Sequence, residues 1–144
     1  FTNDREKVEF TEDLQISATG YGAINGTTLM FPINAFNQNS DIPQRYRNRK
    51  NPFELSRGFQ DEDEIEIAIP VGYSIDSKPE NFELSGKFGN YRIEISSINP
   101  SAIKYKRSLS ISKGFYDKTE YDNFRKFKEQ IAKYDNAKVV LVKK

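Results

Sequence analysis

The chain of 144 residues contains no cysteine, no histidine and no tryptophan. Without cysteine it forms no disulfide and offers neither a thiolate to a metal nor a thiol nucleophile. Without histidine, Ser-His-Asp and Cys-His catalysis are excluded within this chain, as are the usual zinc sites. Carboxylate or lysine chemistry remains open, but no motif indicates it. We therefore expect no catalytic residue, no cofactor and no metal site, and the chain is predicted not to be an enzyme.

Long apolar runs are also missing. No segment is apolar over the length that a membrane-spanning helix needs, and the first residues lack the charged start and apolar core of a signal peptide. The sequence begins at Phe1 rather than at Met, so we expect an excised segment of a larger protein. Its hydrophobic content of 36% and charged content of 30% are typical of a folded protein. We predict one domain over residues 1–144.

The net charge of +1 conceals an uneven distribution. Residues 1–101 carry 10 basic and 16 acidic side chains, whereas residues 102–144 carry 12 basic and 5 acidic ones. A basic C-terminal third attracts nucleic acid or anionic lipid in some proteins. A solvated helix face followed by two terminal lysines explains the same bias more simply, so we expect no nucleic-acid partner.

Alternating apolar and polar residues predict β-strands over most of the chain. The clearest strand runs from Asp61 to Tyr73, where Ile65, Ile67 and Ile69 fall on one face and Pro70 begins a turn. We expect this strand to be central in its sheet, so that Ile67→Asp unfolds the domain.

Eight further strands are predicted at residues 7–18, 23–24, 27–35, 52–55, 82–84, 91–95, 103–111 and 139–142, with Pro32 best placed at an edge. Asn25-Gly26 is a strong signal for a hairpin turn. Residues 37–51 show neither the strand nor the helix period and are predicted to form a long surface loop. Arg107 falls on the apolar face of its strand, which indicates either a bulge or a position near an edge.

Five apolar residues then recur at helical spacing: Tyr121, Phe124, Phe127, Ile131 and Tyr134. Asp117 or Thr119 is expected to cap this helix, and Asn136 to end it in the left-handed conformation. The predicted fold class is mainly β: an antiparallel β-sandwich, immunoglobulin-like or related, with one C-terminal α-helix.

The acidic run Asp61-Glu62-Asp63-Glu64 is a candidate cation site, because clustered carboxylates suit calcium. It lacks the glycine and the spaced ligands of an EF-hand loop. Neighbouring residues on a strand also point to opposite faces, so the four carboxylates do not converge easily. A solvated entry to the strand is the simpler interpretation.

A second charged segment interleaves cations with an aromatic ring, as nucleic-acid and phosphate contacts do: Arg45, Tyr46, Arg47, Arg49 and Lys50. Asp41 and Glu54 flank this loop. We interpret it as an exposed loop or as a surface for a neighbouring domain or a ligand. The eight tyrosines are a separate candidate for a sugar-binding platform, although most lie at strand positions where packing in the core is the usual role.

An ordered series of motifs covers residues 49–143 well and the first 48 residues more loosely. In chain order the motifs are Arg49–Leu55, Asp63–Tyr73, Ser77-x-Pro79, Phe88-Gly89-x-Tyr91, Ile103-x-Tyr105-x-Arg107, Gly114, Tyr121-x-x-Phe124-Arg125-x-Phe127 and Ala137–Leu141. The series resembles a domain family of unknown function found at the C-terminal end of large transglutaminase-like proteins of Bacteroides-type bacteria.

In that family a β-rich domain precedes a papain-like transglutaminase core, and the domain of unknown function comes last. The catalytic Cys-His-Asp set belongs to the core, so none of those roles carries over to this chain. The resemblance implies a non-catalytic accessory domain of a secreted protein, periplasmic or at the cell surface. Its implied partners are the upstream transglutaminase-like domain and a protein or cell-wall glycan substrate. The alternative is a carbohydrate-binding β-sandwich module, and a third option is an enzyme that uses clustered carboxylates.

Overall fold

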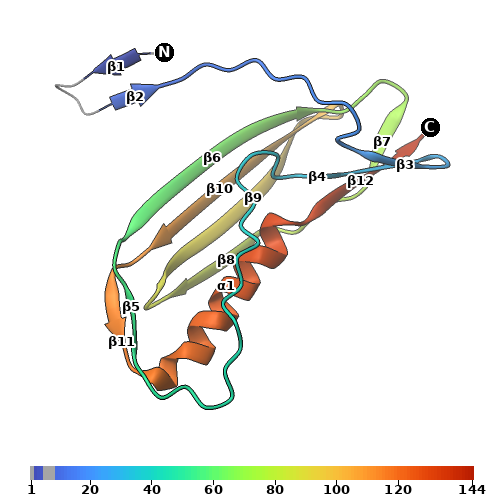
Figure 1. Cartoon of the computed structure of the whole chain (residues 1–144). Coiled ribbons are helices and arrows are strands. Elements are labelled where there is room, and N and C mark those ends of the chain that lie inside the picture. The colour runs from blue at the N-terminus through green and yellow to red at the C-terminus, as the bar shows by residue number, and fades with distance from the viewer. Residues whose placement is uncertain (1, 5–8) are drawn as a thin grey trace.

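The computed structural model describes residues 2–4 and 9–144, and within them the chain forms twelve strands, one 3-10 helix and one α-helix (Figure 1). Their bounds are β1 Thr2–Asp4, β2 Glu9–Thr11, β3 Ala23–Asn25, β4 Thr28–Pro32, β5 Phe53–Leu55, β6 Phe59–Ala68, β7 Tyr73–Ser77, β8 Phe82–Gly86, β9 Gly89–Asn99, β10 Ala102–Ile111, β11 Gly114–Tyr116, η1 Lys118–Glu120, α1 Tyr121–Asp135 and β12 Lys138–Lys143.

Two antiparallel sheets of four strands form the body of the fold. The first sheet has the order β6-β10-β9-β8, and the second has the order β3-β4-β12-β7. Helix α1 lies along one face of the first sheet and leads directly into β12 of the second (Figure 1). The pairs β5–β11 and β1–β2 form two small ribbons. The prediction of a mainly β, antiparallel, sandwich-like fold with one C-terminal helix is confirmed.

One core joins both sheets and the helix. Its most deeply buried apolar side chains come from the first sheet, the second sheet and α1: Tyr91, Ile93, Ile103, Tyr105, Leu109, Ile131, Val139 and Leu141, with Ile33 beside them. Strands β9 and β10 alternate buried and more exposed positions along most of their length, so each presents one face to this core. Burying each large apolar side chain contributes about 1.5–3 kcal/mol, and these strands therefore carry much of the stability.

Strand β6 is an edge strand, so the predicted central position is wrong. Among the described strands it pairs with β10 alone, and β10 occupies a central place between β6 and β9. Ile65 and Ile67 are only half-buried, whereas Ile69, just beyond the strand, is buried. The acidic residues of β6 suit an edge, because charged side chains discourage pairing with further strands. Ile67→Asp is therefore expected to destabilise the fold less than a change at the centre of the sheet.

The predicted strand at residues 7–18 is also wrong in most of its length. Lys7 and Val8 lie outside the described residues, and β2 covers only Glu9–Thr11. Residues 12–22 have no regular structure, and Leu14 and Ile16 are 69% and 64% exposed. The alternation is present in the sequence, but no second layer from the described part of the chain covers it. The β1–β2 ribbon lies apart from the two large sheets (Figure 1).

Several local predictions are confirmed. Gly26 turns the β3–β4 hairpin with φ +60°, residues 37–51 contain no helix or strand, and α1 follows the predicted apolar face. The predicted cap is found one turn earlier than expected: Asp117 caps η1, the 3-10 turn that precedes α1, by accepting a hydrogen bond of 2.9 Å from the backbone N–H of Thr119, whereas Glu120 at the start of α1 makes no side-chain cap hydrogen bond. Asn136 does not adopt the left-handed conformation: its φ is −97°, and its side chain donates instead to the Ala132 carbonyl at 2.8 Å.

Candidate functional site

Strand β10 places a cation inside the core. Arg107 is 3% exposed and shares the inward face with Tyr105 and Leu109, in unbroken alternation. The strand is central, and its irregularity with β9 falls between Ala102 and Ile103, far from the arginine. Both explanations offered for Arg107 from the sequence, a bulge or an edge position, are therefore wrong. The side chain of Arg107 points into the core because carboxylates pair with its charge there.

The main partner is Asp135, the last residue of α1, which is completely buried. Arg107 donates from Nε to Oδ1 at 2.7 Å and from Nη2 to Oδ2 at 2.8 Å. The Tyr91 hydroxyl donates to Oδ1 at 2.8 Å, and the backbone N–H of Asn39 donates to Oδ2 at 3.0 Å. On β6, directly across from the arginine, Asp63 accepts from Nη1 at 3.0 Å. We call these residues the buried polar network: Tyr91, Arg107, Asp135, Asp63 and Asn39.

The electrostatics of this network favour fixed protonation states. Burial by itself lowers the pKa of Arg107, but its hydrogen bonds and opposite charges, Asp135 first and then Asp63, raise that pKa above its ordinary value. Burial and the charge of Asp135 raise the pKa of the Tyr91 phenol far above its usual range. The pKa of the neighbouring Tyr105 phenol is raised mainly by burial. The arginine and the two phenols therefore hold their protons near neutral pH.

The network also holds the segment of residues 34–44, which we call the strap. It lies against α1, where the Tyr121 hydroxyl donates to the Gln44 carbonyl at 2.9 Å and Arg125 Nε donates to the Pro43 carbonyl at 3.1 Å. Lys128 reaches Asn39 Oδ1 at 3.3 Å, and burial lowers the pKa of this lysine, with Asp41 and Asp135 opposing the shift. The strap thus runs along α1, from Asp135 at the C-terminal end of the helix to Tyr121 at its start, and leads into the loop that follows residue 44.

That loop carries the basic residues predicted as a surface. Arg45, Tyr46, Arg47 and Lys50 are exposed, whereas Arg49 is half-buried. Together with the start of the helix, the loop lines a hollow of about 250 Å³ formed by Tyr46, Arg47, Asn48, Arg49, Lys118, Thr119, Tyr121 and Asp122. The structure therefore gathers part of the predicted set around one hollow and adds residues from η1 and α1, which the sequence did not associate with it.

The acidic run divides between the two faces of β6. Asp63 points inward to Arg107, and Glu64 points outward to Lys104 Nζ at 2.7 Å and Lys106 Nζ at 3.0 Å. Hydrogen bonds from these two lysines lower the pKa of Glu64. The run is thus split between the core and the surface, and it does not gather its carboxylates around one point.

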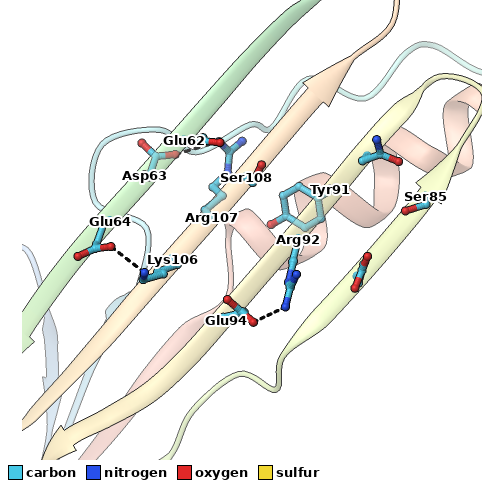
Figure 2. A pocket seen from close by; sticks show the side chains of 12 residues that line it. Glu62, Asp63, Glu64, Ser85, Tyr91, Arg92, Glu94, Lys106, Arg107 and Ser108 are labelled. Atoms are coloured by element: carbon cyan, nitrogen blue, oxygen red, sulfur yellow. Dashed lines mark hydrogen bonds and ion pairs between the residues drawn. The ribbon is translucent and has the colours of Figure 1, made fainter.

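The outer face of the first sheet is polar and hollowed, with a volume of about 800 Å³ (Figure 2). Figure 2 shows Glu64 facing Lys106 across neighbouring strands, and Arg92 facing Glu94 along β9. The charged groups on this face are thus largely paired with one another. Ser85, Ser108, Asn90, Glu62 and Glu83 add to the lining, and Asp63, Tyr91 and Arg107 of the buried polar network border the hollow from beneath.

The tyrosines do not form a flat platform. Tyr91, Tyr105 and Tyr121 are buried, while Tyr21 and Tyr46 are exposed. The ring of Tyr46 lies 5.8 Å from that of Tyr121 at an angle of 54°, so the two do not present one plane to a sugar. This arrangement weakens the carbohydrate-binding interpretation.

Asp135 was missed from the sequence, although a signal was present. It follows Ile131 by four residues and therefore lies on the apolar face of the helix. A carboxylate on one buried face and Arg107 on another imply that the two meet, because isolated buried charges are very costly. Asn39 has no comparable signal, since its backbone N–H makes the contact.

None of the described helices combines the length and the apolar character needed to cross a membrane. No curated protein matches the sequence. A crystal structure of a "putative protease" from Parabacteroides distasonis ATCC 8503 is similar, with a TM-score of 0.62 and 18% sequence identity. The similarity covers 80% of this chain but only 23% of that protein, and it shows a shared fold.

The family comparison covers most of the domain. The model of DUF3858, a domain of unknown function with a solved structure, matches residues 27–141. The match begins at the β3–β4 hairpin and ends in β12, so it includes both large sheets, the strap and α1. The chain therefore belongs to the DUF3858 family.

Proposed function

We propose that this chain is a non-catalytic accessory domain of a transglutaminase-like protein, where it supports the catalytic core or the binding of its substrate. The observation that carries the proposal is the structural likeness, in which 80% of the chain corresponds to 23% of a protein described as a "putative protease". A unit of this size within a much longer enzyme is typical of a domain attached to a separate catalytic part.

The buried polar network supports the same role. The guanidinium of Arg107 donates two hydrogen bonds to the carboxylate of Asp135. The Tyr91 hydroxyl and the backbone N–H of Asn39 donate to the remaining acceptor positions of the same carboxylate. Catalytic groups need a face open to substrate, whereas both ions of this pair are buried. We further propose an exported location, periplasmic or at the cell surface. The partners would be the upstream transglutaminase-like domain and a protein or cell-wall glycan substrate.

The direct test is an assay of the purified chain for amidase, peptidase and transglutaminase turnover. We expect no turnover above that of a mock preparation from cells that lack the expressed chain. A rate that is proportional to the concentration of the chain and persists through further purification would overturn the proposal. An Asp63→Asn variant would then locate the activity, because Asp63 is the acid of the network closest to the surface.

A further inference from the structure

The loop after the strap and the neighbouring η1 present cations that form no ion pair with a carboxylate among the residues that the structure describes. Many basic side chains elsewhere form ion pairs, including those on the first sheet and Arg125 on the helix. In the part of the chain that the structure describes, no carboxylate lies at ion-pair distance from Arg45, Arg47, Arg49, Lys50 or Lys118. We call these five residues, together with Tyr46, the arginine surface.

Arg49 is held in one orientation. Its guanidinium carbon lies 4.2 Å from the centre of the Tyr121 ring, 5.6 Å from that of Phe53 and 5.8 Å from that of Tyr46. Its Nε donates to the Asn51 carbonyl at 2.9 Å. Because the rings of Tyr121 and Phe53 are buried, they form a rigid base for the guanidinium. The arginine therefore loses little conformational freedom when it binds a ligand.

The surroundings of Arg49 favour an anion. The hollow of about 250 Å³ beside it is also lined by Arg47, Lys118 and Asp122, so three cations face a single acid. The strap fixes the start of this loop through the Tyr121–Gln44 hydrogen bond. A planar guanidinium with further cations beside it matches the two oxygens of a carboxylate.

We propose that the arginine surface binds a carboxylate-rich segment of a protein partner, in which Arg49 pairs with an Asp or Glu side chain and Arg47 and Lys118 neutralise its neighbours. The inference rests on the accessory role proposed above in taking the partner to be a protein. A nucleic acid fits less well, because the chain as a whole has a net charge of only +1 and the exposed Tyr46 ring is tilted against Tyr121 rather than open for base stacking.

The test measures binding of a fluorescent poly-glutamate peptide to the whole chain by anisotropy. The triple variant Arg47→Gln/Arg49→Gln/Lys118→Gln should weaken binding by about tenfold or more, since it removes the charge-assisted contacts. The matched triple Arg57→Gln/Lys78→Gln/Lys144→Gln changes the net charge equally at exposed positions elsewhere. It should alter binding by no more than about twofold, because distant exposed charges are screened.

A second variant guards against damage to the fold. Arg47→Gln/Lys118→Gln leaves Arg49 and its ring contacts in place, and circular dichroism confirms folding of each protein. This variant should bind poly-glutamate several-fold more weakly than the parent chain but more tightly than the test triple.

Three results would overturn the inference. They are no binding of poly-glutamate by the parent chain, equal losses in the two triples, and tighter binding of single-stranded DNA than of poly-glutamate. A failure here leaves the accessory role standing, because that role is tested by turnover. Turnover by the isolated chain, in contrast, would refute the accessory role without changing the measured affinity for poly-glutamate.

Discussion

Arg107 and Asp135 form a two-point ion pair in the core, with N–O distances of 2.7 and 2.8 Å. The pair joins a central strand of the first sheet to the last residue of α1. Buried ion pairs add little net stability, because removal of both charges from water costs about as much as their attraction returns. We infer that this pair mainly fixes where the end of the helix sits on the sheet.

The first prediction concerns the loss of one charge from that pair. Asp135→Asn keeps the shape of the side chain but leaves Arg107 buried without its main counter-ion, so the free energy of unfolding should fall by about 3–5 kcal/mol. Urea denaturation measures the change. Asp76→Asn, at an exposed position of β7, should shift stability by less than about 0.5 kcal/mol.

The double variant Arg107→Met/Asp135→Leu tests the physical reason. It removes both charges and should recover most of the stability lost in Asp135→Asn. A double variant as unstable as the single one would show that the two residues contribute through shape rather than through charge.

The second prediction concerns alkaline pH. The pKa of the Tyr91 phenol is raised in the folded chain, so above about pH 10 the unfolded chain loses a proton that the folded chain keeps. Stability from this group is complete below pH 10 and is lost as the pH rises. Tyr91→Phe should lower stability at neutral pH by about 1.5–3 kcal/mol, the range for a hydrogen bond to a charged group.

Urea midpoints measured between about pH 9 and pH 11 test the slope. The decline with pH should be shallower in Tyr91→Phe than in the parent chain, since one shifted phenol is gone. Parallel declines would contradict the assignment of the alkaline instability to Tyr91.

The third prediction concerns the tight hairpin between β8 and β9. Gly89 has φ +145°, and a side-chain carbon there would overlap the carbonyl oxygen of Ser110 on the neighbouring strand. Gly89→Ala should therefore cost at least about 2 kcal/mol. Gly86→Ala, at the other end of the same turn, meets nothing within 4 Å and should be nearly neutral. Similar thermal midpoints for the two variants would contradict this account of the hairpin.

The fourth prediction concerns the aromatic cluster around Phe53. This ring stacks on Tyr116 at 5.3 Å and meets the edge of Tyr121 at 5.5 Å. Phe53→Ala should cost about 3–5 kcal/mol and should loosen the loop that carries Arg49. Phe115, on the paired strand β11, is 71% exposed, so Phe115→Ala is the matched control and should change stability little. Differential scanning calorimetry distinguishes the two, and equal losses would refute the role of the cluster.

The structural features that depend on residues close together in the chain were predicted correctly from the sequence. The Asn25-Gly26 turn, the helix face from Tyr121 to Tyr134 and the absence of regular structure in the loop of residues 37–51 all depend on neighbours along the chain, and the structure confirms them. The sequence did not predict the position of β6 in its sheet, because an isoleucine face looks the same on an edge and on a central strand. That position depends on β10, which lies far along the chain.

The candidate sites show the same division. The basic residues of the loop were recognised as a surface from composition, but the rigid base under Arg49 was not, because Tyr121 reaches it only through the fold. Arg107 was recognised as unusual on an apolar strand face, but it was assigned to a bulge or an edge. Its counter-ion Asp135 comes from the end of α1, and this pairing is formed only by the fold. Non-local pairing of charges, rather than any local motif, organises this core.

The accessory role is tested most directly on the complete gene product, compared with a version that lacks residues 27–141. Turnover of a small amide substrate should be measured per folded molecule, with folding checked by calorimetry. The accessory role predicts that the shortened protein retains its kcat on the small substrate, while its thermal stability falls or its KM for a protein substrate rises. A folded, shortened protein that has lost turnover of the small substrate altogether would contradict it, because a catalytic group would then lie within this domain.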